Sequence, residues 1–217
     1  MIARASLLLL FLAVLPAALS GQQPPAGAPN PLLQAWTTPF GVPPFGEIKP
    51  EHFLPAIRAG VDAQRKEIDA IANSPEPPTF ANTIEAMENA GELLAKVSPV
   101  FSNMQSSNTN EQLQAINREV APLLTALRDD IRLNPALFAR VRTLWQARAS
   151  LPLTPVQARL LDEQYKSFVR GGANLTPEQK DRFRAINAEL WRSASSSATT
   201  SCTTRTPTGS SSRRTRT

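Results

Sequence analysis

The sequence predicts an all-α protein, and three observations support this prediction. The apolar residues are mostly Ala, Leu, Ile and Val at spacings of three and four, which is the period of an amphipathic helix. No segment alternates apolar and polar residues as a half-buried strand does. Thr154-Pro155 and Thr176-Pro177 each place a capping residue and a proline directly before an apolar period, which is a typical start of a helix.

Residues 1–20 are organised like a secretory signal peptide. They begin with a positive charge at Arg4, continue with an apolar run from Leu7 to Val14, and end in small residues before Gly21. A membrane anchor is the alternative, but this run is well short of the ~20 apolar residues that span a bilayer. We therefore expect export across the inner membrane, cleavage, and a periplasmic product.

Residues 21–49 form a proline-rich arm. Nine of the 20 prolines lie in the first fifty residues, which excludes long helices there and favours extended backbone. The start of the arm is predicted to be a spacer, and its later part is expected to lie on the folded body. A ligand for a proline-recognition module is the alternative. The apolar side chains expected on the body are Leu32, Leu33, Trp36, Phe40 and Phe45.

Residues 50–190 are predicted to be the helical body. Pro50 opens its first helix, which extends to about residue 72. The second helix is predicted to begin near Thr83, with Asn82 as the cap and Glu85 completing a capping box. A single apolar stripe then continues to residue 107, with a kink or split expected at Pro99.

The later helices of the body are predicted from capping residues at their starts and from prolines and glycines that interrupt or end them. Asn108 or Thr109 is predicted to cap the third helix, which is kinked at Pro122 and ends at residues 134–135. A shorter helix follows to about residue 149. Two more begin at residues 155 and 177, and the first of them stops at Gly171-Gly172, where glycine can take the left-handed conformation.

Residues that could carry chemistry are scarce. His52 is the only histidine, and no second histidine or cysteine lies near it in the sequence, so we do not interpret it as a metal ligand or a proton carrier. The body has no cysteine, and therefore no disulfide. We assign no catalytic, cofactor-binding or metal-ligating residue to this chain.

The net charge of +5 comes from the last residues of the chain. From Trp191 onward there are five arginines and no acidic residue, which leaves 18 basic and 18 acidic residues in the rest. A body without a basic face does not favour nucleic-acid binding, which depends on phosphate contacts. We therefore expect no nucleic-acid partner.

Four segments of the chain, taken in order, carry a resemblance to a known family. They are NPLLQAWTTPFGVPPFGEIKPEHFLPAI (30–57), PTFANTIEAMENAGELL (78–94), IRLNPALFARV (131–141) and FVRGGANL (168–175). They resemble the N-terminal region of the peptidyl-dipeptidase Dcp and oligopeptidase A family, which are thimet-oligopeptidase-like zinc metallopeptidases. The resemblance extends from about residue 30 to 190 and departs from the family at Leu127, where a histidine would be expected.

The resemblance implies a helical zinc enzyme that cleaves short peptides. In such enzymes two histidines of an HExxH helix and a later glutamate hold the zinc ion, and the glutamate of the motif takes a proton from the metal-bound water. No HExxH is present in this sequence. By resemblance, residues 50–190 supply helices of the wall and lid over the substrate channel, and the chain binds no zinc itself.

Residues 191–217 differ in character from the body. They are rich in Ser, Thr and Arg without an apolar period, which is typical of a disordered tail. A frameshift is the sharper interpretation, because reading the codons from Ser197 in another frame permits a run beginning Phe-Ser-Asp-Asn-Leu-Leu-His. That run resembles what the family carries next.

Two hypotheses for function follow. The first is an N-terminal fragment of an exported peptidyl-dipeptidase or oligopeptidase that is inactive alone and lacks its C-terminal catalytic region. The second is a non-catalytic periplasmic helical module that binds peptides or proteins. Nothing in the residues identifies the preferred peptide.

Overall fold

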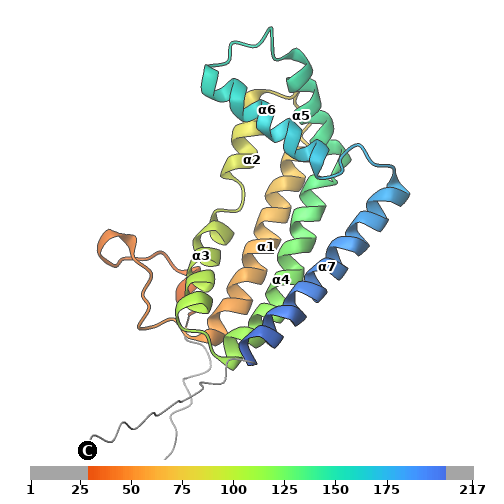
Figure 1. Ribbon diagram of the computed structural model, residues 1–217. Coiled ribbons are helices and arrows are strands. Elements are labelled where there is room, and N and C mark those ends of the chain that lie inside the picture. The colour runs from red at the N-terminus through yellow and green to blue at the C-terminus, as the bar shows by residue number, and fades with distance from the viewer. Residues whose placement is uncertain (1–28, 204–217) are drawn as a thin grey trace, which may run out of the picture.

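The computed structural model describes residues 29–203, and these residues contain helices and no strand, so the all-α prediction is confirmed. Figure 1 shows a long helix, α1, beside α3 and α4, with α7 along α4 and with α5 and α6 at one end. The signal-peptide prediction for residues 1–20 lies outside the described residues. The elements are η1 (Pro31–Leu33), η2 (Pro39–Gly41), α1 (Pro50–Ala72), η3 (Phe80–Glu85), α2 (Ala86–Asn89), α3 (Glu92–Ser107), α4 (Glu111–Arg132), α5 (Pro135–Ala147), α6 (Pro155–Arg170) and α7 (Pro177–Thr203).

Helix α1 is shared by two hydrophobic cores. Its first turns pack with the arm, α3 and α4 in what we call the first core. Its last turns pack with η3, α5 and α6 in the second core. The helix therefore supplies Phe53, Ile57 and Val61 to one core and Ile68 and Ala72 to the other.

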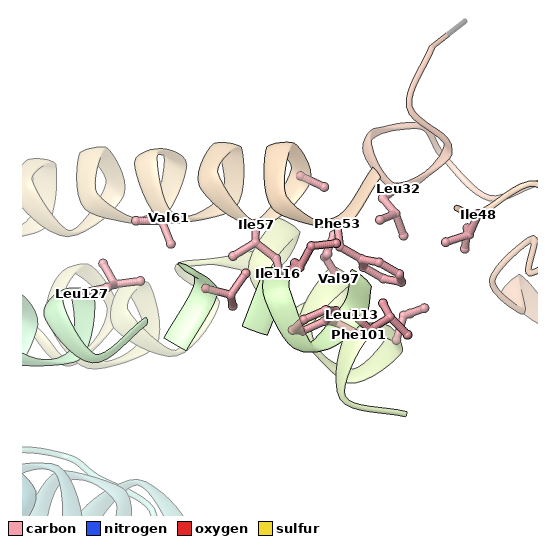
Figure 2. Close-up of a cluster of buried hydrophobic side chains, with 13 residues drawn as sticks. Leu32, Ile48, Phe53, Ile57, Val61, Val97, Phe101, Leu113, Ile116 and Leu127 are labelled. Carbon is pink, nitrogen blue, oxygen red and sulfur yellow. The ribbon is translucent and has the colours of Figure 1, made fainter. Parts of the chain in front are cut away.

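The first core is built on two aromatic rings. Phe53 of α1 and Phe101 of α3 lie with their ring centroids 5.1 Å apart, and Figure 2 shows them among the aliphatic side chains of α1, α3 and α4. Gly60 lets α1 and α3 approach closely, because a β-carbon at this position would lie 3.2 Å from the Leu94 Cα. Leu113 of α4 is fully buried in the same core.

The second core is aromatic along its α5 and α6 side. The ring of Phe138 lies 5.9 Å from both Tyr165 and Phe168, and Tyr165 stacks on Trp145 at 4.0 Å. Stacked and offset rings add to the free energy of burial. This packing joins α5 and α6 into an antiparallel pair across the end of α1.

A buried arginine fixes the loop between α1 and η3. Arg140 of α5 is only 7% exposed. Its Nη1 donates to the backbone oxygens of Ser74 (3.2 Å) and Glu76 (2.9 Å). Its Nη2 donates to Asn82 Oδ1 (2.9 Å) and its Nε to Thr83 Oγ1 (3.3 Å). The guanidinium group thus satisfies backbone groups that the loop itself leaves open.

The second predicted helix begins earlier than expected. Thr79 is the cap, not Asn82, and the two residues exchange reciprocal hydrogen bonds: Asn82 N donates to Thr79 Oγ1 (3.1 Å) and Thr79 N to Asn82 Oδ1 (2.8 Å). The prediction of Asn82 and Glu85 as the capping pair was wrong. The first turns, η3, are π-helical before α2 begins.

The same predicted helix also breaks in a different place. It ends at Asn89, and Gly91 begins α3 with a φ of +87°, a conformation that glycine adopts at little cost. Its N–H donates to Glu67 Oε2 of α1 at 2.6 Å. Pro99, where we expected a kink or split, lies inside the uninterrupted α3. A proline removes one hydrogen bond, whereas the left-handed residue redirects the chain.

The other caps agree with the sequence with one exception. Asn134, Thr154 and Thr176 accept hydrogen bonds at the starts of α5, α6 and α7. The cap of α4 is Asn110, which accepts from Leu113 N at 2.8 Å, and the prediction of residue 108 or 109 was wrong by one or two positions. Helix α5 ends at Ala147, two residues before the expected end.

The arm lies on the body through only part of its apolar side chains. Leu32 is fully buried in the first core, and Trp36 packs against that core with the Lys96 ammonium 4.4 Å from its ring centroid. The prediction was wrong for Phe40, which is fully exposed with a φ of +59° at the tip of a turn. Phe45 and Leu33 are also exposed. These three side chains therefore lie in solvent rather than in the first core.

Helix α7 extends into the segment that the sequence assigned to a tail. It continues to Thr203, so residues 191–203 are helical, while residues 204–217 lie outside the described residues. The segment from residue 178 to 203 contains no proline or glycine, so nothing in its composition stops a helix that has already begun at Pro177. Between residues 29 and 203, no helix is both long and apolar enough to cross a membrane.

Candidate functional site

The described residues do not contain a metal-binding or catalytic constellation. No group of three or more His, Cys, Asp and Glu side chains within residues 29–203 lies close enough to hold a metal ion. His52 lies at the start of α1, where its Nδ1 accepts the Lys49 N–H at 3.0 Å. The position of His52 is thus explained by helix capping, and these residues do not fit a zinc ion.

A groove lies between α4 and α7. Its volume is about 580 Å³, which is within the range of small-ligand sites. We call it the α4–α7 groove. It is lined by Arg118, Pro122, Thr125, Ala126, Asp129, Asp130, Arg184, Ala188 and Trp191.

Small side chains open this groove. Pro122 and Ala126 on α4 and Ala188 on α7 leave space between the two helices, and Trp191 of α7 also lines this space. The helices are held together beside the groove by a hydrogen bond from Asn187 Nδ2 to Asp129 Oδ1 at 2.9 Å. The buried Asp129 is therefore satisfied across the helix pair.

Charged side chains lie at the rim of the α4–α7 groove. Asp130 forms an ion pair with Arg65 of α1 at 3.1 Å and a longer one with Arg184 of α7 at 3.9 Å. These groups are partly exposed to solvent, so each pair contributes little to stability. The groove offers apolar walls with both charge signs at its edge, which suits binding. It contains no pairing of a nucleophile with a general base.

Sequence reasoning assigned no site residue and did not find this groove. Asp129 and Asn187 are separated by 58 positions, and each looks like an ordinary solvated residue of an amphipathic helix. The only signal was the unusual placement of Pro122 and Ala126 on the same face of α4 as Asp129 and Asp130. That signal does not indicate which helix packs there.

Comparison with known proteins gives relatives of one kind. The chain is 44% identical over 160 residues to a dipeptidyl carboxypeptidase of Salmonella typhimurium, which covers 74% of this chain and 24% of that protein. It is 41% identical over the same length to a dipeptidyl carboxypeptidase of Escherichia coli, with the same coverage. An oligopeptidase A of Escherichia coli is 25% identical over 161 residues, which is 74% of this chain and 23% of that protein. No family model matches the chain. The chain spans about a quarter of the length of the curated relatives it matches.

Proposed function

Because the chain belongs, over the matched 160 residues, to the family of dipeptidyl carboxypeptidase and oligopeptidase A, we propose that it is the N-terminal part of an exported metallopeptidase. The whole enzyme hydrolyses short peptides and removes dipeptides from their C-termini. The observation that carries this proposal is the 44% identity over 160 residues to a dipeptidyl carboxypeptidase.

In this proposal the chain is scaffold and its partner is the catalytic region of the enzyme. The whole enzyme requires zinc, whose ligands do not lie in this sequence, because the sequence has one histidine and no HExxH. The described residues do not fit a zinc ion either, so we assign them no step of peptide hydrolysis. Their role is to form part of the wall around the channel that admits short peptides.

Export and a displaced reading frame belong to the same proposal. The layout of residues 1–20 supports secretion to the periplasm with removal of the leader. The change of composition at residue 191 supports a shift of frame in the underlying gene. Reading the nucleotide sequence beyond the Leu190 codon tests the shift: an open second frame that reaches an HExxH motif is expected, and immediate stop codons in that frame would exclude it.

We expect the purified chain to release no dipeptide from a short peptide in the presence of Zn²⁺. The physical reason is that hydrolysis requires a metal-activated water, and no ligand set for the metal is present among residues 29–203. Product is measured by liquid chromatography with mass spectrometry. A complete dipeptidyl carboxypeptidase assayed in parallel is the control, and zinc-dependent turnover by this chain alone would refute the scaffold role.

The second candidate function is a helical module that binds peptides without cleaving them. The α4–α7 groove favours it, because the groove has apolar walls and is accessible from solvent. We expect Ala126→Trp, which fills the groove, to weaken the binding of a short peptide to the chain roughly tenfold or more, as loss of a well-packed contact does. Binding is measured by titration calorimetry.

The matched control for this experiment is Ala158→Trp. Ala158 is exposed on α6 and does not line the groove, so the same enlargement there leaves peptide binding unchanged. If the unmodified chain binds no peptide, or if both variants bind equally well, the α4–α7 groove is not a peptide site.

A further inference from the structure

A second concavity lies where the two hydrophobic cores meet. Its volume is about 410 Å³, and it is enclosed by α1, α2, α3, α4 and α6 beside the break at Gly91. We call it the central pocket. Half of its lining residues are polar or charged, and these are Gln64, Glu88, Ser98, Arg128, Arg132 and Gln164.

Three of the polar residues in this lining, apart from the arginines, already form hydrogen bonds through their side chains to groups other than Arg128. The Glu88 carboxylate accepts a hydrogen bond from Gln164 Nε2. The Gln164 Oε1 accepts a long hydrogen bond from Arg132 Nη1 at 3.4 Å. Gln64 Nε2 donates to the backbone oxygen of Ala90 at 3.3 Å. Among the lining residues, only Gln164 accepts a hydrogen bond from either of the two guanidinium groups.

The two arginines are incompletely paired. Within residues 29–203, Arg128 makes no hydrogen bond and no ion pair. Arg132 has only the long bond to Gln164 and a stacking contact, with its Cζ 5.2 Å from the ring centroid of Phe168. A guanidinium group carries five N–H donors, so most of the N–H groups of Arg128 and Arg132 can donate hydrogen bonds to a ligand.

The two positive charges also repel each other. They lie four residues apart on α4, where like charges are neighbours on the helix surface. Burial lowers the pKa of the Arg132 guanidinium below its ordinary value, the charge of Arg128 lowers this pKa further, and Glu88 partly offsets both effects. An anion between the two arginines would relieve the repulsion.

We propose that the central pocket binds a carboxylate group of a small organic ligand between the guanidinium groups of Arg128 and Arg132. Two guanidinium forks match the planar geometry of a carboxylate and form charge-assisted hydrogen bonds with it. The volume of the pocket accommodates a small molecule. With two arginines and Glu88 in the lining, the net charge of +1 favours an anion over a neutral ligand, and the apolar lining residues favour an organic anion over inorganic phosphate.

The site does not depend on the proposed peptidase function. It is formed entirely by residues of α1, α2, α3, α4 and α6 within the described part of the chain. Its ligand is recognised by the carboxylate, with the Ser98 side chain also in the lining.

The test is a titration of the ¹⁵N-labelled full chain with N-acetylglycine at constant ionic strength, followed by NMR. We expect saturable chemical-shift changes around α2 and the C-terminal turns of α4. N-acetylglycinamide, which lacks the negative charge, is the matched ligand control and is expected to cause no such change. Inorganic phosphate is the third probe and is expected to bind more weakly than N-acetylglycine.

Arg128→Gln is the informative variant. Its side chain is exposed and has no hydrogen bond or ion pair within the described residues, so the substitution leaves the fold intact. Loss of a charge-assisted contact is expected to weaken N-acetylglycine binding roughly tenfold. Arg182→Gln removes the same charge from the exposed face of α7, away from the pocket, and is expected to leave binding unchanged.

Three results would overturn the proposal. The first is the absence of saturable binding of N-acetylglycine by the unmodified chain. The second is an equal loss of binding in Arg128→Gln and Arg182→Gln, which would show a general charge effect. The third is tighter binding of phosphate than of N-acetylglycine, which would assign the pocket to a different oxyanion.

Discussion

Replacing Arg140 by methionine is expected to lower the free energy of unfolding by about 3 kcal/mol. The arginine is buried and donates to the backbone oxygens of Ser74 and Glu76 and to the side chains of Asn82 and Thr83. Methionine fills part of the same volume but makes none of these hydrogen bonds. Asn82 Oδ1 keeps the Thr79 N–H as a donor, whereas the backbone oxygens of Ser74 and Glu76 lose the guanidinium group. Loss of a hydrogen bond to a charged group costs about 1.5 to 3 kcal/mol. The measurement is urea unfolding followed by far-UV circular dichroism.

The control for this experiment lies on the same helix. Arg142 is exposed, and its Cζ lies 5.7 Å from the ring centroid of Phe138. Arg142→Met is therefore expected to change the free energy of unfolding by less than about 1 kcal/mol. Arg140→Lys keeps the positive charge but loses the planar guanidinium group. Its free energy of unfolding should therefore lie between those of Arg140→Met and Arg142→Met. If Arg140→Met is as stable as Arg142→Met, the hydrogen bonds of the guanidinium group do not hold the loop at residues 73–79.

Replacing Phe53 by alanine is expected to cost about 3 to 5 kcal/mol of stability. The side chain is fully buried in the first core, where its ring lies 5.1 Å from that of Phe101. Removing the ring forfeits its apolar burial and leaves a cavity that α1 and α3 cannot close, because the two helices already touch at Gly60 and Leu94. The loss is measured as a shift of the urea midpoint at unchanged slope.

The control is the replacement of Phe40 by alanine, which distinguishes the effect of burial from the effect of losing a phenylalanine. Phe40 is fully exposed and has a positive φ, so Phe40→Ala removes no packed surface. Its effect is expected to stay within about 0.5 kcal/mol of zero. A loss at Phe40 comparable to that at Phe53 would mean that the arm packs on the body more tightly than its exposure indicates.

Helix starts with a proline could be predicted from the sequence almost to the residue. Pro50, Pro135, Pro155 and Pro177 each open a helix, because proline is favoured at the first position and excluded from most later ones. The break at Gly91 was not predicted, because Gly91 falls at a position that continues the apolar stripe of a single helix. Only the left-handed backbone and the hydrogen bond to Glu67 show that it separates two helices.

The cap of η3 shows why some local choices cannot be settled from the sequence alone. Thr79 and Asn82 are both good capping residues, so the rule itself fits either position. Long-range packing decides between them, since Arg140 donates to Asn82 Oδ1 from α5, 58 positions away. This contact and the reciprocal bond to Thr79 together hold Asn82 inside the first turn rather than ahead of it.

The candidate sites depend on contacts that the sequence pattern does not specify. The α4–α7 groove requires α7 to pack on α4 through Asn187 and Asp129, and the central pocket requires side chains from five helices. Amphipathic periodicity shows which face of a helix is buried but not which partner covers it. For that reason Arg128 and Arg132 looked like ordinary solvated charges of α4.

Because α1 is shared, the two cores do not behave as independent lobes. Loss of packing in the aromatic cluster of α5 and α6 would expose the C-terminal turns of α1. The N-terminal turns of the same helix pack against Phe101 and Leu113. Gly91 interrupts the helical path between α2 and α3, which is only one of the connections between the two halves. Because the two cores share α1, we expect both halves of the molecule to unfold together.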